Sequence, residues 1–270
     1  MKDSTARALN ALNRRFYSEI AHEFSATRER PWAGWQRITA LLRSESLDTA
    51  RWLVLDAGCG NGRFGHFLAQ ELNRPLHYIG LDFCPELLAE ARRRLVNCPG
   101  IECELRECDL LENRWSESLR ERCQLTAAFG IFHHVPGAAQ RARLLRALAS
   151  TLAPGGLLTF SLWLRHAGEH LRPKHAPWNE EPARGGDTID PADLETGDTL
   201  LRWGRGPSLR YCHFADETEV EQLSRALAFE SVDQFRADGV SGDWNHYSIL
   251  RRPRDGDYGR SSSRCCDVPR

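Results

Sequence analysis

The chain has 270 residues, of which 41% are hydrophobic and 27% charged, as in an ordinary globular protein that can bury a core. This length suits one α/β domain with additions, or at most two small domains. The formal net charge of −1 excludes a global field that attracts nucleic acid, so no DNA partner is predicted. Local arginine clusters would have to make any contact with RNA.

The composition also indicates where the protein works. No run approaches the ~20 apolar residues of a membrane span, so no membrane partner is predicted. Residues 1–10 are polar and lack the apolar stretch of a signal peptide. The nine cysteines contain no Cys-x-x-Cys pair and no zinc spacing, which favours reduced thiols and no metal site. These features predict a cytoplasmic protein, with the nucleus as an alternative.

Residues 1–50 are predicted to form an N-terminal helical cap. Apolar residues recur at helical spacing along residues 9–28, which indicates an amphipathic helix. A second helix is expected at 35–42, after Pro31 and Trp32.

A glycine-rich turn follows the first predicted strand, which covers residues 52–56 and ends in Asp56. The glycines stand at every second position, at Gly58, Gly60 and Gly62. Glycine lets the backbone pass close to a ligand and adopt positive φ. Arg63 occupies the place of the third glycine of a dinucleotide fingerprint, and no P-loop Gly-Lys-Ser/Thr is present. The pattern resembles instead the first motif of class I methyltransferases, which bind S-adenosylmethionine (SAM).

Two further strands are predicted to end near carboxylates. Asp82 closes the strand at 77–82, where its two oxygens could hold a ribose diol. A similarly placed acid occurs in NAD sites, and a loop carboxylate or helix cap is ordinary in isolation. Asp109 follows the strand at 101–105. The methyltransferase resemblance implies that Asp109 accepts a hydrogen bond from an adenine amino group, and that the N–H of Leu110 contacts the ring.

Strands and helices alternate from residue 51 to 252, which predicts an α/β fold with a doubly wound, seven-stranded, mainly parallel sheet and an antiparallel edge. The other helices are expected at 62–72, 85–96, 144–152 and 217–227, and the other strands at 127–132, 157–163, 229–236 and 245–251. An inserted loop between the fifth and sixth strands is expected at 165–196. Residues 253–270 lack periodicity and are expected to form a disordered tail.

Two groups of polar residues are given ordinary interpretations. His166 and His170 have a spacing that could seat a metal, but nothing completes a ligand set, so a solvated loop is preferred. The arginines at 92–94 and at 141, 143 and 146 are interpreted as solvated helix faces, with phosphate contact as the alternative.

Segments outside the cofactor motifs resemble the enzymes that esterify the carboxymethyl group on the wobble uridine of tRNA. The segments are 16–32, 131–134, 197–203, 210–214 and 242–244. The resemblance implies tRNA as substrate and a small zinc-containing activator protein as partner. Three features depart from the family pattern: Cys212 replaces a tyrosine, Asp243 replaces an asparagine, and the inserted loop has Lys174 as its single lysine.

A carboxylate acceptor is ionised at pH 7 and needs a cation that orients it rather than a general base. Arg28 is the first choice for this cation, and a surface arginine near a helix end is the alternative. His133 and His134 follow the fourth strand, where class I methyltransferases place acceptor-side residues; either could instead pack or cap a turn. Arg210 is expected to clamp a nucleotide with Tyr211 and His213, or to lie in a buried edge segment.

The sequence therefore predicts SAM-dependent methyl transfer, with a carboxymethylated wobble uridine of tRNA as acceptor. A methyltransferase for a small carboxylate or phenol is the main alternative. A SAM-fold subunit without catalytic activity is the alternative from another functional class.

Overall fold

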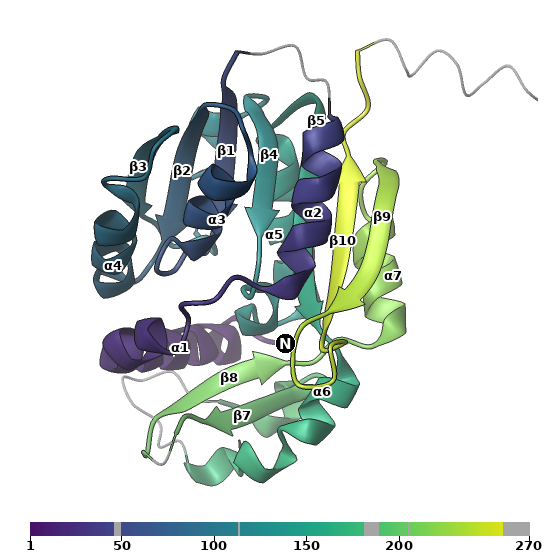
Figure 1. Cartoon of the computed structure of the whole chain (residues 1–270). Coiled ribbons are helices and arrows are strands. Elements are labelled where there is room, and N and C mark those ends of the chain that lie inside the picture. The colour runs from purple at the N-terminus through teal and green to yellow at the C-terminus, as the bar shows by residue number, and fades with distance from the viewer. Residues whose placement is uncertain (46–49, 113, 181–188, 205, 256–270) are drawn as a thin grey trace, which may run out of the picture.

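The structure is a computed structural model that describes residues 1–45, 50–112, 114–180, 189–204 and 206–255 (Figure 1). The strands of its central sheet are β1 (Trp52–Ala57), β2 (Leu76–Asp82), β3 (Ile101–Glu107), β4 (Cys123–Ala128), β5 (Leu152–Trp163), β9 (Glu230–Ala237) and β10 (Asn245–Arg251). Their order is β3-β2-β1-β4-β5-β10-β9. The first five pair in parallel, and β10 is antiparallel to both β5 and β9. The predicted doubly wound sheet is confirmed.

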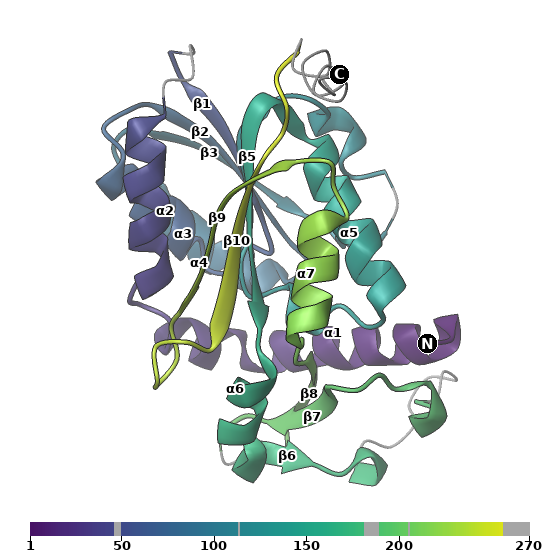
Figure 2. The same ribbon diagram turned by 90° about the vertical axis from the view of Figure 1, so that its right-hand side faces the viewer.

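Helices cover both faces of this sheet (Figures 1 and 2). One face carries α2 (Ala33–Ser44), α3 (Arg63–Glu71) and α4 (Pro85–Leu95), and the other carries α5 (Ala138–Ser150) and α7 (Glu217–Arg225). Val54 and Leu55 are neighbours on β1, yet they belong to opposite cores because successive side chains of a strand point to opposite faces. Sheets buried on both faces have strands that are apolar at nearly every position.

The helix α1 (Asp3–Ala26) covers the carboxyl ends of the parallel strands instead of a face of the sheet (Figure 1). It begins earlier than the predicted helix. Phe16, Tyr17 and Ile20 pack with Cys84 and Leu87 at the start of α4. Ligands of doubly wound folds bind beyond the carboxyl ends of the strands, so α1 is positioned to close such a site.

The predicted inserted loop contains regular structure and extends beyond residue 196. It includes α6 (Arg165–His170) and three antiparallel strands, β6 (His175–Ala176), β7 (Asp198–Arg202) and β8 (Leu209–His213). Residues 181–188 lie outside the described part. The sequence did not indicate this small sheet because strands of two to five residues show too little periodicity. Leu9 and Leu12 of α1 pack with Tyr211 on β8, so the insertion and the cap share a core.

The fourth strand differs from its prediction at 127–132, because β4 ends at Ala128. Gly130 has a φ of +69°, which ends the extended backbone, and residues Phe132–His134 form a 3-10 helix, η2. An apolar run does not distinguish a strand from a buried turn, and Phe132 is fully buried. The other 3-10 helices are Glu117–Leu119, Arg172–Lys174, Trp178–Glu180 and Pro191–Asp193.

Three expectations concern the chain as a whole. Among the described helices, none combines the length and apolar character needed to cross a membrane. The seven cysteines at described positions are all free thiols. The predicted tail lies, from residue 256 onward, outside the described residues.

Candidate active site

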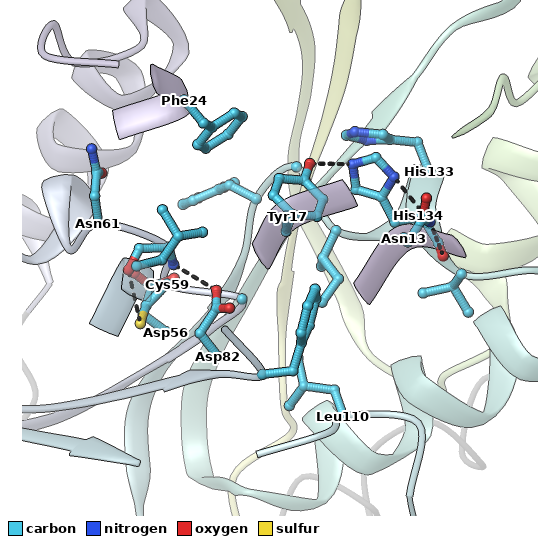
Figure 3. Close-up of a pocket in the computed structure, with 18 of the residues that line it drawn as sticks. Asn13, Tyr17, Phe24, Asp56, Cys59, Asn61, Asp82, Leu110, His133 and His134 are labelled. Atoms are coloured by element: carbon cyan, nitrogen blue, oxygen red, sulfur yellow. Dashed lines mark hydrogen bonds between the residues drawn. The ribbon is translucent and has the colours of Figure 1, made fainter. Parts of the chain in front are cut away.

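A cavity lies beneath α1 at the carboxyl ends of the strands (Figure 3). It brings together all but one of the site residues predicted from the sequence. Those that line it are Arg28, Asp56, Gly58, Gly60, Asp82, Asp109, Leu110, His133, His134 and Arg210. Gly62 is the exception.

The glycines of the turn have two different functions. Gly58, Gly60 and Gly62 have φ values of +75°, +53° and +72°, which other residues rarely adopt. A Cβ on Gly60 would meet nothing within 4 Å, whereas a Cβ on Gly62 would lie 2.9 Å from the Cβ of Ala91. Gly60 therefore leaves space for a ligand, and Gly62 permits α3 to pack against α4.

Two buried carboxylates face the cavity beside this turn. Asp82 accepts hydrogen bonds from the N–H groups of Gly60 (2.8 Å) and Cys84 (3.0 Å), and Asp56 accepts one from the Tyr78 hydroxyl (2.6 Å). Burial raises the pKa of Asp82 to about 6 and the pKa of Asp56 to about 7, although these hydrogen bonds oppose the shift. In the described residues neither carboxylate has a cation within 4.0 Å, so both remain available to donors of a ligand.

The third carboxylate, Asp109, is covered by α1. It accepts hydrogen bonds from the N–H of Leu111 (2.8 Å) and from Nη2 of Arg14 (2.5 Å). Arg14 also lies over the ring of Phe83, at 5.6 Å. Sequence reasoning missed Arg14, because a polar residue on an amphipathic helix normally faces solvent. An ionised carboxylate has about four lone-pair positions, so Asp109 can still accept a hydrogen bond from a ligand.

His134 connects α1 to the insertion. Its Nε2 lies 2.7 Å from the Tyr17 hydroxyl (Figure 3). Its Nδ1 lies 2.9 Å from the carbonyl oxygen of Tyr211. A carbonyl only accepts, so Nδ1 carries the proton and Nε2 accepts from Tyr17. Burial, followed by the charge of Arg210, lowers the pKa of His134 to about 3. His134 is therefore a neutral residue with both nitrogens engaged.

His133 differs from its neighbour, because its Nδ1 is buried without a hydrogen-bond partner among the described residues. Its ring stacks on Trp163, with 3.8 Å between centroids and 7° between planes. Burial, then the neighbouring His134 and Arg210, lowers the pKa of His133 well below its usual value. His133, which lines the cavity, is therefore a neutral imidazole with one unpaired nitrogen among the described residues.

Arg210 is a buried cation surrounded by aromatic rings. Its guanidinium carbon lies 5.4 Å from the ring of Phe16 and 5.5 Å from those of Trp163 and Trp203. Its Nη1 is 3.5 Å from the Tyr17 hydroxyl, and its Nε has no partner in the part of the chain that the structure describes. No described carboxylate lies within 4.0 Å of it.

Arg28 lies near Arg210 and shares one of its aromatic neighbours. Its guanidinium is 4.8 Å from the Phe24 ring and 5.3 Å from the Trp203 ring, and Nη1 donates to Thr27 at 3.1 Å. Burial and the charge of Arg210 lower the pKa of Arg28. Like Arg210, it has no carboxylate partner among the described residues. Two partly desolvated cations without a counter-ion are costly, which favours an anionic ligand between them.

The segment around Arg210 divides between two environments. Tyr211 and His213, predicted to join Arg210 in a clamp, do not line the cavity. The Tyr211 hydroxyl donates to Asp198 at 2.7 Å, and the His213 ring nitrogens lie 2.7 Å from Asp198 and from Glu219. Alternate residues of a strand point to opposite sides, so β8 presents Arg210 to the cavity and its neighbours to this network.

Arg141 corrects another expectation, because it is only 1% exposed and not on a solvated face. It donates to Glu195 at 2.6 Å, to Glu219 at 2.5 Å and to the carbonyl of Val135 at 3.0 Å. The pattern of the helix alone did not indicate these contacts, because the acceptors lie on other elements. His166, considered above as a metal ligand, is 3.1 Å from the carbonyl of Asp243.

Residues 54–156 match the family model described as a methyltransferase domain. A protein of Encephalitozoon cuniculi whose name describes it as a methyltransferase is 30% identical over 224 residues, or 81% of this chain and 87% of the relative. The mouse tRNA (carboxymethyluridine(34)-5-O)-methyltransferase ALKBH8 is 30% identical over 54% of this chain, a match that spans only 19% of the mouse protein.

The fold is similar to solved methyltransferases. One is the Burkholderia thailandensis 1,6-didemethyltoxoflavin-N1-methyltransferase, solved with bound 1,6-didemethyltoxoflavin and S-adenosylhomocysteine. Its TM-score is 0.57, with 19% identity over 92% of this chain and 90% of that one. The identity is low, so this likeness concerns the fold alone.

Proposed function

Because the chain belongs to the class I SAM-dependent methyltransferases, we propose that it methylates a carboxylate, and that this carboxylate is the carboxymethyl group of a wobble uridine in tRNA. The observation that carries the proposal is the pair Arg210 and Arg28. Both lie at the cavity beside Trp203, and neither has a carboxylate partner among the described residues.

The end of the cavity away from these two arginines has residues suited to bind SAM. The open space at Gly60 accommodates a ligand close to the backbone, and Asp82 would accept hydrogen bonds from the ribose diol. Asp109 and Leu110 would hold the adenine. When bound, the cofactor supplies a methyl carbon that its sulfonium has already activated, so the protein mainly aligns the acceptor and excludes water.

The acceptor end needs no general base, because a carboxylate is already ionised at neutral pH. The planar fork of Arg210 matches two carboxylate oxygens, and Arg28 adds a second cation from α1. His133 contributes a free Nδ1 in a neutral ring. We assign His134 a positioning function instead, since both of its nitrogens are engaged with Tyr17 and Tyr211.

The choice of tRNA rests on relatives whose names describe tRNA methyltransferases, and on aromatic side chains suited to hold a splayed-out base. A small-molecule carboxylate or phenol is the second candidate. Cys212 and Asp243 favour it, because the wobble-uridine enzymes usually carry tyrosine and asparagine there. An intact glycine turn with Asp82 at the cavity argues against a subunit without catalytic activity.

The test is mass spectrometry of tRNA nucleosides after purified protein is incubated with SAM and tRNA that carries unmethylated carboxymethyluridine. We expect the methyl ester at the wobble position. The resemblance implies a small zinc-containing activator protein, so the assay is run with and without one. Absence of the ester under both conditions, while SAM still binds, would favour the small-molecule acceptor.

A further inference from the structure

A second hollow lies between α3 and α4, outside the cavity that holds the candidate active site. Its polar lining consists of His66, Gln70, Arg94 and Asn97, and no carboxylate lines it. The set contains one permanent cation and two amides that can donate hydrogen bonds. Its chemistry therefore suits an anion rather than a metal ion.

Arg94 is the main cation of this hollow. Its Nη1 is buried and has no hydrogen-bond partner among the described residues, and no described carboxylate is within 4.0 Å of it. Burial lowers the pKa of Arg94, while Glu29 and Glu90 oppose this from a greater distance. Glu90 itself forms an ion pair with Arg93 and lies 3.5 Å from Nδ1 of His22. Arg94 thus has donor capacity that the protein leaves unused.

Arg63 connects the hollow to the active-site cavity. It lines that cavity, and its guanidinium lies 5.1 Å from the ring of Trp32. It follows Gly62, where an added Cβ would lie 3.0 Å from Leu95 on α4, so the two helices are in close contact. Burial, then the charges of Arg28 and Arg94, lowers the pKa of Arg63 to about 10.

Four arginines without a described carboxylate partner thus form a series from the acceptor end of the cavity to the hollow between α3 and α4. They are Arg210, Arg28, Arg63 and Arg94. This continuity matters because the net charge of the chain is −1, so local cations have to provide any affinity for a polyanion.

We propose that the hollow between α3 and α4 binds a backbone phosphate of the RNA whose modified base enters the cavity. This inference rests on the proposed function. A nucleotide in the cavity is joined to its neighbours through phosphates, and the chain must leave the cavity along the surface. Phosphate contacts set the position of a nucleic acid, and arginine binds phosphate through two parallel hydrogen bonds.

The test compares Arg94→Gln with the wild type on tRNA. Loss of one phosphate contact should lower the slope of log affinity against log salt by about 0.7, the value for single strands. The KM for tRNA should rise about tenfold, with kcat and SAM affinity unchanged. Arg94→Lys should keep the salt slope and restore part of the affinity. Arg225→Gln is the matched control, because Arg225 lies on α7, over the other face of the sheet, and pairs with Glu221.

A second substrate separates this inference from the proposed function. Wild type and Arg94→Gln should methylate the free carboxymethyluridine nucleoside at equal rates, because it carries no phosphate. An unchanged salt slope and KM for tRNA in Arg94→Gln would overturn the inference while leaving the proposed function intact. Failure of the wild type to modify tRNA at all would overturn both.

Discussion

Two buried arginines, Arg141 on α5 and Arg210 on β8, have opposite surroundings. Arg141 donates to two carboxylates and a carbonyl. Arg210 has three aromatic rings around it and a single long contact with the Tyr17 hydroxyl. Both are charged at physiological pH, because arginine is not deprotonated in proteins.

The difference shows how burial alone can be misread. Arg141 is a buried cation whose acceptors are all supplied by the protein itself. Its contacts with Glu195 and Glu219 attach the insertion to α5 and α7. A buried cation that lacks a counter-ion, such as Arg210, lowers the stability of the folded protein, which indicates that a ligand supplies the missing anion. The predictions below test this contrast.

The largest effect is expected from Arg141→Met, on the free energy of unfolding. It removes the cation that Glu195 and Glu219 share, leaving two partly buried carboxylates without it. Breaking a buried pair in this way costs about 3–5 kcal/mol of unfolding free energy. Urea denaturation should show this loss, and Arg146→Met, an exposed position on the same helix, should stay within about 0.5 kcal/mol of wild type. Equal stability of the two variants would show that the network does not hold the insertion.

Arg210→Gln should have the opposite effects, with stability nearly unchanged and activity lowered. No described carboxylate loses a partner, so stability should change by less than about 1 kcal/mol. The acceptor loses a charge-assisted contact worth about 2–5 kcal/mol, so kcat/KM should fall about 30-fold or more while SAM affinity holds. Arg28→Ala should act in the same direction, with partial rescue by lysine. Steady-state kinetics with the acceptor identified by mass spectrometry decides this, and normal turnover in both variants would remove the pair from the mechanism.

The sequence predicted some of these features and missed others, for physical reasons. The strands of the central sheet are visible in the sequence as apolar runs, and the predicted cofactor residues lie at or just after the ends of these strands. Both could therefore be predicted from short stretches of sequence. Arg14 and Arg141 were missed because their meaning depends on residues about 50 or more positions away, which pattern reasoning on one helix does not see. Tyr211 and His213 were grouped with Arg210 because they are adjacent in sequence, although the alternation of a strand separates them.

The cofactor end offers a pH test. The pKa of Asp82 is raised from 3.8 to about 6 by burial, so folding favours its protonated form between these values. Its contribution to stability therefore falls as the pH rises from about 4 to 6. SAM needs the ionised carboxylate, so affinity should rise over the same range and level off above pH ~6, with a slope near tenfold per unit below it. Calorimetry at several pH values measures this.

Asp82→Asn is the control for that titration. It should weaken SAM by roughly 1.5–3 kcal/mol, the range for hydrogen bonds to a charged group, and its affinity should lose the pH step near 6. A step that persists in Asp82→Asn would belong to another group, of which Asp56, with a pKa of about 7, is the nearest candidate.

The smallest effect is expected from Tyr17→Phe, which removes the hydroxyl between Arg210 and His134. His134 Nε2 then loses its donor, and such a lost hydrogen bond costs about 1 kcal/mol. Because Tyr17 is the one described hydrogen-bond partner of Arg210, kcat/KM for the acceptor should fall about fivefold, with SAM affinity unchanged. Tyr78→Phe is the matched comparison, since Tyr78 donates to Asp56 at the cofactor end. It should weaken SAM and leave the acceptor KM unaltered. If both variants weaken only SAM, Arg210 does not depend on Tyr17 for its orientation, and the aromatic rings alone hold it.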